Sequence, residues 1–348
     1  MNRHFLFLAL LAAAPLATAQ TRFYSPAPFA HHDGLTSTGY PIGYSSYTKM
    51  TYQQVHGDLP AVPQPILRLA FRPRSTSASH AAYAVNLTLV LSLGGPLPSA
   101  ASATFAANLG PSPMTVLNQS TVNIPAFTQA GTAPAPYHYA FPFPVPFLYD
   151  GKGVLCWEMR VHSHSFTGTS SLSFDLYSTQ TAVTLRSGGV GCTCAGQAAP
   201  ATLSGSSNPG SLALNCNGLP AAQPVLLLIG IRSTMYGPLP LPFDLTPLGA
   251  PCALRTDMLL TAAGLASAGT ASWQFPVPAA APDGTAVFFQ VLAPDAAANP
   301  LGLVLSNGLA AVWPYAKQPA VRIWKTADDQ ALSGSLQLTY GLVTELGL

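Results

Sequence analysis

The stretch VLCWEMRVHSHS, at residues 154–165, gathers the side chains of this sequence that are best suited to chemistry. It contains a cysteine, an acid, a base and two histidines in a chain of which only 7% is charged. On a β-strand, residues two apart share a face and lie about 7 Å apart. His162 and His164 could then grip one metal ion, and they are the candidate metal ligands.

A metal at this pair needs a further ligand, because zinc sites use three or four protein groups. Glu158 lies about 13 Å from His162 along an extended strand, so it cannot reach the same ion. The third ligand would have to come from His138 or from the cluster His31-His32-Asp33.

The same stretch also fits an ordinary strand. Alternation places Leu155, Trp157, Met159 and Val161 on a core side, and Cys156, Glu158, Arg160, His162 and His164 on the other side. In this interpretation the acid and the arginine make cross-strand ion pairs, and the two histidines mark a strand that runs out into a loop.

Other catalytic signatures are missing from the sequence. It has no Gly-x-Ser-x-Gly elbow, no His-Glu-x-x-His, no P-loop and no EF-hand loop. A glycosidase needs two carboxylates that face each other across a cleft. Asp150, Glu158 and Asp175 could converge in this way, but their spacing does not require it, and we expect loop and strand-surface acids.

The first residues predict export. Arg3 precedes a short apolar run, and Ala17-Thr18-Ala19 is a small-x-small cleavage signal. The run is too short to span a membrane, which takes about 20 residues. We therefore expect residues 1–19 to be a signal peptide, Gln20 to begin the secreted chain, and the mature protein to lack a transmembrane segment.

The composition of the chain argues against nucleic acid as a partner. The formal net charge is +2, and without clustered Lys and Arg there is no footprint for nucleic acid. With 49% hydrophobic residues, a core can form. A net charge near zero permits self-association or adhesion to a surface. No cofactor is predicted.

Strand patterns dominate the chain. Its 34 prolines and 29 glycines disfavour long helices, whereas short alternating runs recur. In PILRLAFRP, Leu67, Leu69 and Phe71 share a face; AYAVNLTLVLSL alternates from Tyr83 to Leu93. The prediction is an all-β fold of two antiparallel β-sandwich domains, jelly-roll or Ig-like, with little helix.

In AFPFPVPFLYD, residues 140–150, phenylalanines alternate with prolines. Because proline cannot donate to a central ladder, we expect an edge strand or a polyproline segment with its aromatics turned into the core. A ligand-stacking aromatic face is the alternative.

Domain limits follow from shifts in composition. The glycine-rich run RSGGVGCTCAG suggests a boundary, so that residues 20–188 form an N-terminal sandwich and residues 189–316 a cysteine-bearing one. Residues 317–348 read as strands that complete one of the two domains, and the sequence leaves open which.

A family resemblance agrees with this organisation. The segments ILRLAFRP, LTLVLSL and FLYDGKGVLCWEMRV, and above all GCTCAG, YGPLPLPFDLTPLGAPCAL and FFQVLAPDAAANPLGLVLSNGL, resemble uncharacterised secreted two-domain β-sandwich proteins common in planctomycete-type bacteria. The resemblance covers most of residues 50–345. It implies secretion and all-β modules, and no particular activity.

Five cysteines in an exported chain suggest disulfides. A bridge between Cys192 and Cys194 would be strained, so each is expected to join Cys216 or Cys252. The resemblance implies Cys194–Cys252, which leaves Cys192–Cys216. A zinc site is the alternative, disfavoured by the Cys-x-Cys spacing. Cys156 is left over, as a buried free thiol.

The predicted function is that of a secreted, non-catalytic envelope or extracellular protein with a structural or surface-binding role. Its expected partners are polysaccharide or envelope components. One alternative is a secreted metal-dependent or carboxylate hydrolase centred on Glu158, His162 and His164. The other is a carbohydrate-binding module that uses Trp273, Trp313, Trp324 or the aromatics of residues 141–149.

Overall fold

The computed structural model describes residues 22–129, 133–168, 172–180, 182–208, 210–277, 285–314 and 318–347. Throughout these ranges the regular structure consists of antiparallel strands and short 3-10 turns, which confirms the all-β prediction. No helix in these ranges is long and apolar enough to cross a membrane. The predicted signal peptide, residues 1–19, and Gln20 lie outside the described residues.

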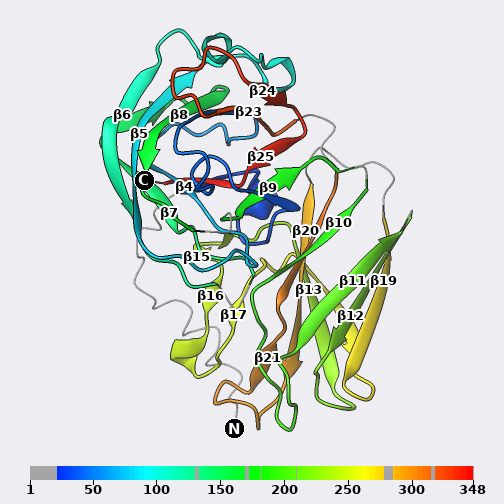
Figure 1. The fold of residues 1–348 in the computed structure, drawn as a ribbon. Helices are drawn as coiled ribbons and strands as arrows, with labels where there is room; N and C mark the ends of the chain where they lie inside the picture. Colours follow the sequence, from blue (N-terminus) through cyan, green and yellow to red (C-terminus); the bar gives the residue numbers. More distant parts are fainter. Residues whose placement is uncertain are drawn as a thin grey trace.

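Three sheets form what we call the first assembly, in the upper part of Figure 1. Their strand orders are β24-β23-β3-β8-β5-β6, β1-β26-β4-β7 and β2-β9-β25. The strands are β1 (Phe23–Ser25), β2 (Thr36–Thr38), β3 (Met50–His56), β4 (Gln64–Phe71), β5 (Tyr83–Leu93), β6 (Met114–Ile124), β7 (Tyr139–Tyr149), β8 (Leu155–His164), β9 (Phe174–Ser178), β23 (Ala320–Thr326), β24 (Ser335–Gln337), β25 (Tyr340–Leu342) and β26 (Thr344–Gly347). The 3-10 turns η2 (Ala27–Phe29), η3 (Pro98–Ala100) and η4 (Phe105–Asn108) lie between them in sequence.

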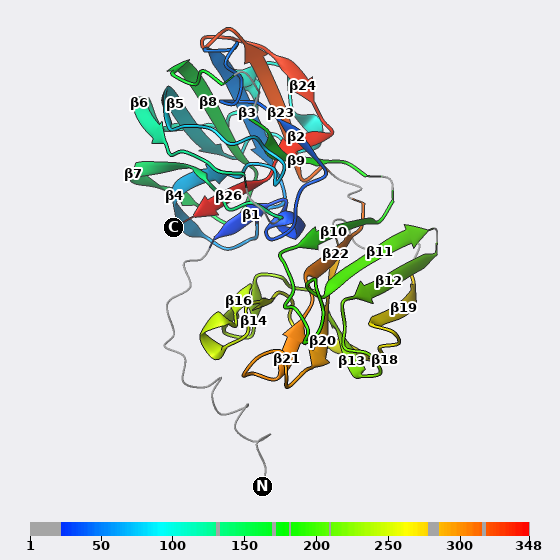
Figure 2. The same cartoon turned by 60° about the horizontal axis from the view of Figure 1, so that its bottom comes forward.

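The second assembly holds a sheet ordered β10-β22-β20-β13-β18, with β21 paired to β20, and a three-stranded sheet ordered β11-β12-β19. Figure 2 shows this assembly beside the first. Its strands are β10 (Thr184–Gly188), β11 (Thr202–Asn208), β12 (Ser211–Asn217), β13 (Pro224–Gly230), β18 (Leu260–Leu265), β19 (Thr270–Pro276), β20 (Ala286–Pro294), β21 (Leu303–Leu305) and β22 (Gly308–Val312). Two small ribbons pair β14 (Met235–Tyr236) with β15 (Leu239–Pro240) and β16 (Phe243–Asp244) with β17 (Ala253–Leu254); η5 (Thr246–Leu248) follows β16.

The period-2 pattern explains the core of the first assembly. In β5, Tyr83, Val85, Leu87, Leu89 and Leu91 are all buried, whereas the residues between them are mostly half-buried. In the neighbouring strand β8, Trp157 points inward as predicted and stacks on Tyr52 at 5.4 Å between ring centroids.

The proline-interrupted strand β7 lies at the edge of its sheet, as predicted. Its aromatic residues Phe141, Phe143, Phe147 and Tyr149 are buried in the core of the first assembly. Both the edge position and the inward aromatics follow from the alternation of proline with aromatic residues. The prolines cannot donate hydrogen bonds to a further strand at the open edge, and the aromatic residues between them share the face that is turned to the core.

Strand pairing shows where the C-terminal segment goes. β23 pairs with β3, β25 with β9, and β26 lies between β1 and β4, so all of them join the first assembly. In the opposite direction, β10, which precedes the predicted boundary at residue 188, pairs with β22 of the second assembly. The chain therefore leaves the first assembly before β10 and returns to it after β22.

A small apolar cluster joins the two assemblies, and a buried ion pair of the first assembly lies next to it. Phe29 and Tyr177 pack with Phe288, Ala310 and Val312 in one buried cluster. Beside the segment that carries Phe29, the guanidinium of a fully buried arginine, Arg72, donates to the Asp175 carboxylate from Nε at 2.7 Å and to the Ala30 carbonyl at 3.0 Å. These contacts hold the N-terminal segment between the sheets.

Candidate functional site

The two histidines predicted as metal ligands lie on opposite faces of β8. The register of β5 and β8 shifts between Asn86 and Leu87, so that Val161 lies opposite Leu87 and His164 opposite Val85. His162 is the extra residue of this bulge. Since Val85 and Leu87 are core residues, His164 lies on their side, and His162 lies on the other. The expectation of one shared face was wrong, because a bulge breaks strict alternation.

Each ring nitrogen of the two histidines has a protein partner. His162 Nδ1 lies 2.7 Å from Asp329 Oδ2, and its Nε2 lies 2.9 Å from Thr88 Oγ1. His164 Nε2 lies 3.0 Å from the Tyr47 carbonyl oxygen, and its Nδ1 accepts the Phe166 amide at 3.3 Å.

Over the described ranges, no group of three or more His, Cys, Asp or Glu side chains could hold a metal ion. Metal binding at His162 and His164 stays a prediction without its original geometric basis.

The side of β8 on which a strand-surface acid was expected is buried at Cys156 and Glu158 and half-buried at Arg160 and His162. Cys156 packs with Phe105 in a second small core, and burial raises the pKa of its thiol well above the ordinary value. Glu158 is 1% exposed; it accepts hydrogen bonds from Gln53 Nε2 at 3.0 Å and from Arg160 Nε at 2.7 Å. The expected ion pair therefore runs along one strand rather than across two.

The cysteine pairing differs from the one that the resemblance implied. The disulfide joins Cys192 to Cys252, with a Cα–Cα distance of 5.1 Å, so Cys194–Cys252 and Cys192–Cys216 were wrong. Cys192 is placed by backbone hydrogen bonds to Leu305 and Ala201. The thiols of Cys194 and Cys216 are free and buried.

The other predicted residues also have structural partners. Asp175 accepts the Gly34 amide at 2.8 Å in addition to Arg72. Trp313 is buried at 9% exposure, and Trp324 is half-buried, stacked on Tyr40 at 5.7 Å. Trp273 lies on the inner side of its sheet, opposite Leu214.

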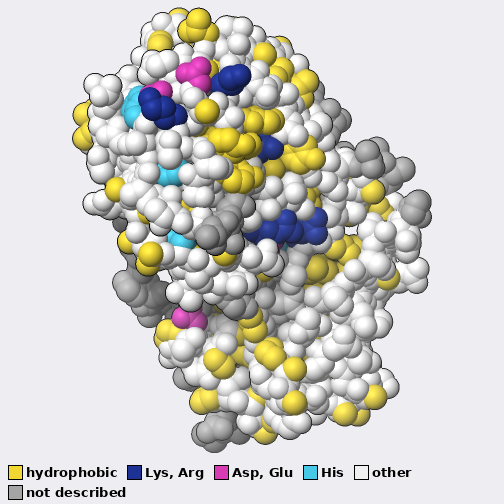
Figure 3. All heavy atoms as spheres, in the orientation of Figure 1, with side chains coloured by type: hydrophobic (Ala, Val, Ile, Leu, Met, Phe, Trp, Pro, Cys, Tyr) yellow, Lys and Arg dark blue, Asp and Glu magenta, His cyan; other side chains and the backbone are white. Residues whose placement is uncertain are grey.

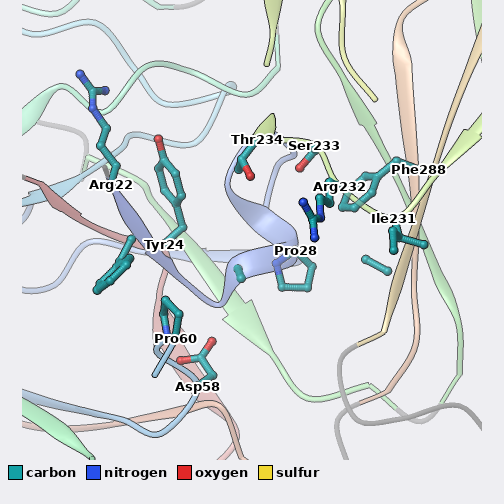
Figure 4. A pocket seen from close by; sticks show the side chains of 13 residues that line it. Arg22, Tyr24, Pro28, Asp58, Pro60, Ile231, Arg232, Ser233, Thr234 and Phe288 are labelled. Atoms are coloured by element: carbon teal, nitrogen blue, oxygen red, sulfur yellow. The ribbon is translucent and has the colours of Figure 1, made fainter. Parts of the chain in front are cut away.

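A cleft of about 460 Å³ between the assemblies contains chemistry that sequence reasoning missed. Figure 4 shows the Asp58 carboxyl and the Arg232 guanidinium directed into it from the two assemblies. Tyr24, Ser233 and Thr234 add hydroxyls to the lining. Burial raises the pKa of Asp58 to about 7, so this carboxyl titrates near neutral pH.

A chain of hydrogen bonds leads from this carboxyl into the core. Ser25 Oγ lies 2.5 Å from Asp58 Oδ1 and 2.7 Å from His56 Nδ1, and Trp157 Nε1 donates to His56 Nε2 at 2.8 Å. An indole N–H can only donate, so His56 Nε2 accepts and Nδ1 carries the proton. Burial lowers the pKa of His56 to about 3, which keeps the ring neutral.

The donor and acceptor roles in this series of hydrogen bonds determine whether Ser25 can act as a nucleophile. A nucleophilic serine must give its proton to the histidine. Here His56 Nδ1–H donates to Ser25, which in turn donates to Asp58, so the histidine has no lone pair available to the serine. The arrangement can relay hydrogen bonds to the cleft, but it does not activate Ser25.

The second surface missed from the sequence is the open side of β11-β12-β19. The register of these strands places twelve residues on that side: Thr202, Ser204, Ser206 and Asn208; Ser211, Ala213, Asn215 and Asn217; Thr270, Ser272, Gln274 and Pro276. We call it the polar face. Ser211 and Ala213 are half-buried and the other ten residues are exposed. The region over these strands, at the right of Figure 3, shows no charged side chains.

No family model and no curated protein matches the chain. Among solved structures, the naturally occurring empty particles of cowpea mosaic virus, its top component, share 10% identity over 95% of this chain and 90% of that chain. The TM-score is 0.13, and at this value the likeness carries no argument.

Proposed function

We propose that the protein is an exported, non-catalytic component of the cell envelope or extracellular matrix, and that it binds a surface through the polar face. On this proposal it belongs with the secreted two-domain β-sandwich proteins that its sequence resembles, and its two assemblies are the sandwich domains. The disulfide Cys192–Cys252 is compatible with an oxidising destination.

The observation that carries the proposal is the polar face itself. One side of the three-stranded sheet packs on the core of the second assembly through Leu203, Leu212 and Leu214. The other side is exposed to solvent, and it carries hydroxyl and amide groups on all three strands. An open, ordered array of hydrogen-bonding groups suits adhesion to an extended surface better than enclosure of a small substrate.

The acid and base groups that sequence reasoning singled out support binding over catalysis. The buried carboxylates of Glu158 and Asp175 are each paired with an arginine, the half-buried Arg160 and the fully buried Arg72. Ser25 receives a hydrogen bond from the histidine that would have to activate it. These contacts favour structural roles for the residues on which a hydrolase would depend.

Co-sedimentation of the purified exported chain with an envelope fraction tests the proposal. The double variant Ser204→Asp/Ser272→Asp adds two charges to the centre of the polar face, and we expect it to be released from the pellet. Thr115→Asp/Asn123→Asp, on exposed positions of β6, adds the same charge elsewhere and should sediment like the wild type. Equal sedimentation of all three proteins would contradict the proposal.

A further inference from the structure

We propose that the ligand of the polar face is a neutral polysaccharide. This inference rests on the proposed function, because it names the chemical class of what that same face binds. It differs from the aromatic stacking considered for the tryptophans, since no aromatic side chain belongs to the face.

Charge is the first argument. The two segments that form the face, residues 202–217 and 270–277, contain no Asp, Glu, Lys, Arg or His. An anionic or cationic polymer would leave its charges without partners there, and burying an unpaired charge is costly. A neutral polymer has no such charges, so the face selects against nucleic acid, acidic glycans and glycans with free, protonated amino groups.

Hydrogen-bonding capacity is the second argument. Ser272 Oγ donates to Asn215 Oδ1 at 3.2 Å, and Gln274 Nε2 donates to Ser211 Oγ at 3.0 Å. These bonds orient the side chains, and each hydroxyl still has lone pairs to offer, while each amide keeps further N–H groups. The face therefore presents donors and acceptors together, which is what a hydroxyl-rich sugar chain requires.

Repetition is the third argument. Cross-strand rows such as Ser204-Asn215-Ser272 and Ser206-Ala213-Gln274 follow one another along the sheet. Strands lie about 4.8 Å apart and same-side residues about 7 Å apart, so four rows extend over roughly 20 Å. The rows Thr202-Asn217-Thr270 and Ser204-Asn215-Ser272 present the same hydroxyl, amide and hydroxyl order. A repeating ligand can meet successive rows, whereas a compact small molecule would contact only one or two.

A tryptophan packs beneath the face. Trp273 lies on the inner side, and a Cβ on Gly264 of β18 would come within 2.7 Å of its ring. Glycine at position 264 thus lets the indole lie against the backbone of β18. The Trp273 Nε1–H donates to the Ala263 carbonyl at 3.3 Å, which holds the middle of β19 in place.

Binding to defined polymers tests the inference. The full exported chain is incubated with microcrystalline cellulose, chitin, neutral β-glucan and neutral mannan, and in parallel with alginate and chitosan as charged polymers. We expect binding to at least one neutral polymer, none to the charged ones, and little change between about 0.05 and 0.5 M salt, because no ion pair is involved. Ser204→Asp/Ser272→Asp should weaken that binding at least about tenfold, and the β6 control should not.

The outcomes separate the two proposals. If the wild type sediments with envelope through the polar face but binds none of the neutral polymers, the inference fails and the proposed function stands. If it binds a charged polymer with strong salt dependence, the inference is also overturned. If the Asp pair leaves both envelope and polymer binding unchanged, both proposals fail. Melting temperatures of the two variants within a few degrees of the wild type establish that they fold.

Discussion

Replacing Asp58 by asparagine should change how the stability of this protein depends on pH. In the folded chain burial raises the pKa of Asp58 to about 7, against 3.8 in the unfolded chain. Between these values the folded protein holds a proton that the unfolded chain has released. The free energy of unfolding must therefore fall as pH rises from about 4 to about 7, and stay at the lower value above that.

The size of the effect follows from the shift. A difference of about 3 pKa units corresponds to at most about 4 kcal/mol at 1.36 kcal/mol per unit. Asp58 is half-buried and lies at a cleft that water can enter, so screening reduces this ceiling, and we expect about 1–2 kcal/mol. The amide introduced by Asp58→Asn keeps an oxygen for the Ser25 hydroxyl and cannot ionise, so this loss should be absent from the variant.

Other groups titrate in the same range and must be separated from Asp58. Burial lowers the pKa of His31 to about 4 and those of His32 and His56 to about 3. Each of these favours the fold above about pH 6.5, and its contribution is lost as pH falls toward the folded pKa. This slope is opposite to that of Asp58, and it is common to wild type and variant, so it cancels in their difference.

The assay is guanidinium unfolding followed by tryptophan fluorescence at several values from about pH 5 to pH 8. The stability of Asp58→Asn relative to wild type should rise by about 1–2 kcal/mol across this interval. Asp150→Asn, at an exposed carboxylate, serves as the control and should give a flat difference. If the stability of Asp58→Asn relative to wild type stayed constant or fell with rising pH, the inference that the Asp58 carboxyl has a raised pKa in the folded protein would be refuted.

Three further predictions concern the interior. Cys252→Ser opens a disulfide that spans 60 residues, which should cost about 4 kcal/mol of unfolding free energy by loop entropy, whereas Cys194→Ser should cost less in the same denaturant titration. Cys156 is fully buried with a raised thiol pKa, so mass spectrometry should find it unalkylated by iodoacetamide in the native protein and alkylated after unfolding; labelling at equal rates would contradict its placement. Arg72→Met leaves the buried Asp175 carboxylate without its partner and should lower the unfolding free energy by about 3–5 kcal/mol. The double variant Arg72→Met/Asp175→Leu removes the unpaired charge and should recover part of this loss. No recovery would argue against an unpaired charge as the cause.

Alternation was sufficient to predict that these segments form strands, and in β5 it also predicted which side chains are buried. The inward position of Trp157 and the inward aromatics of β7 follow from period 2 and from proline chemistry, both of which are local. The all-β fold could be predicted for the same reason.

Bulges set the limit of that reasoning. In β4 the register shifts between Ile66 and Arg68, and Leu67, expected on the buried side with Leu69 and Phe71, is exposed. The same effect separates His162 from His164. The sequence of one strand does not predict where a bulge inserts an extra residue, because the position of the bulge depends on the pairing with the neighbouring strand.

Contacts between residues far apart in the sequence could not be predicted either. Ser25, His56 and Asp58 meet only because β1 and the end of β3 converge beside the cleft. The polar face was missed for another reason. The alternating run at residues 271–278 predicts β19, but β11 and β12 lie in a segment rich in Ser, Gly and Asn for which no strand was predicted. Leu212, Leu214 and Cys216 alternate with polar residues there and could have predicted β12.

Hydroxyl-radical footprinting of the protein bound to envelope tests the central claim most directly. If the polar face is the binding surface, bound protein should be protected in the peptides that span residues 202–217 and 270–277, relative to free protein. The peptides of β5 and β6 should be modified equally in both states. Protection confined to β5 and β6, or no protection at β11, β12 and β19, would contradict the account.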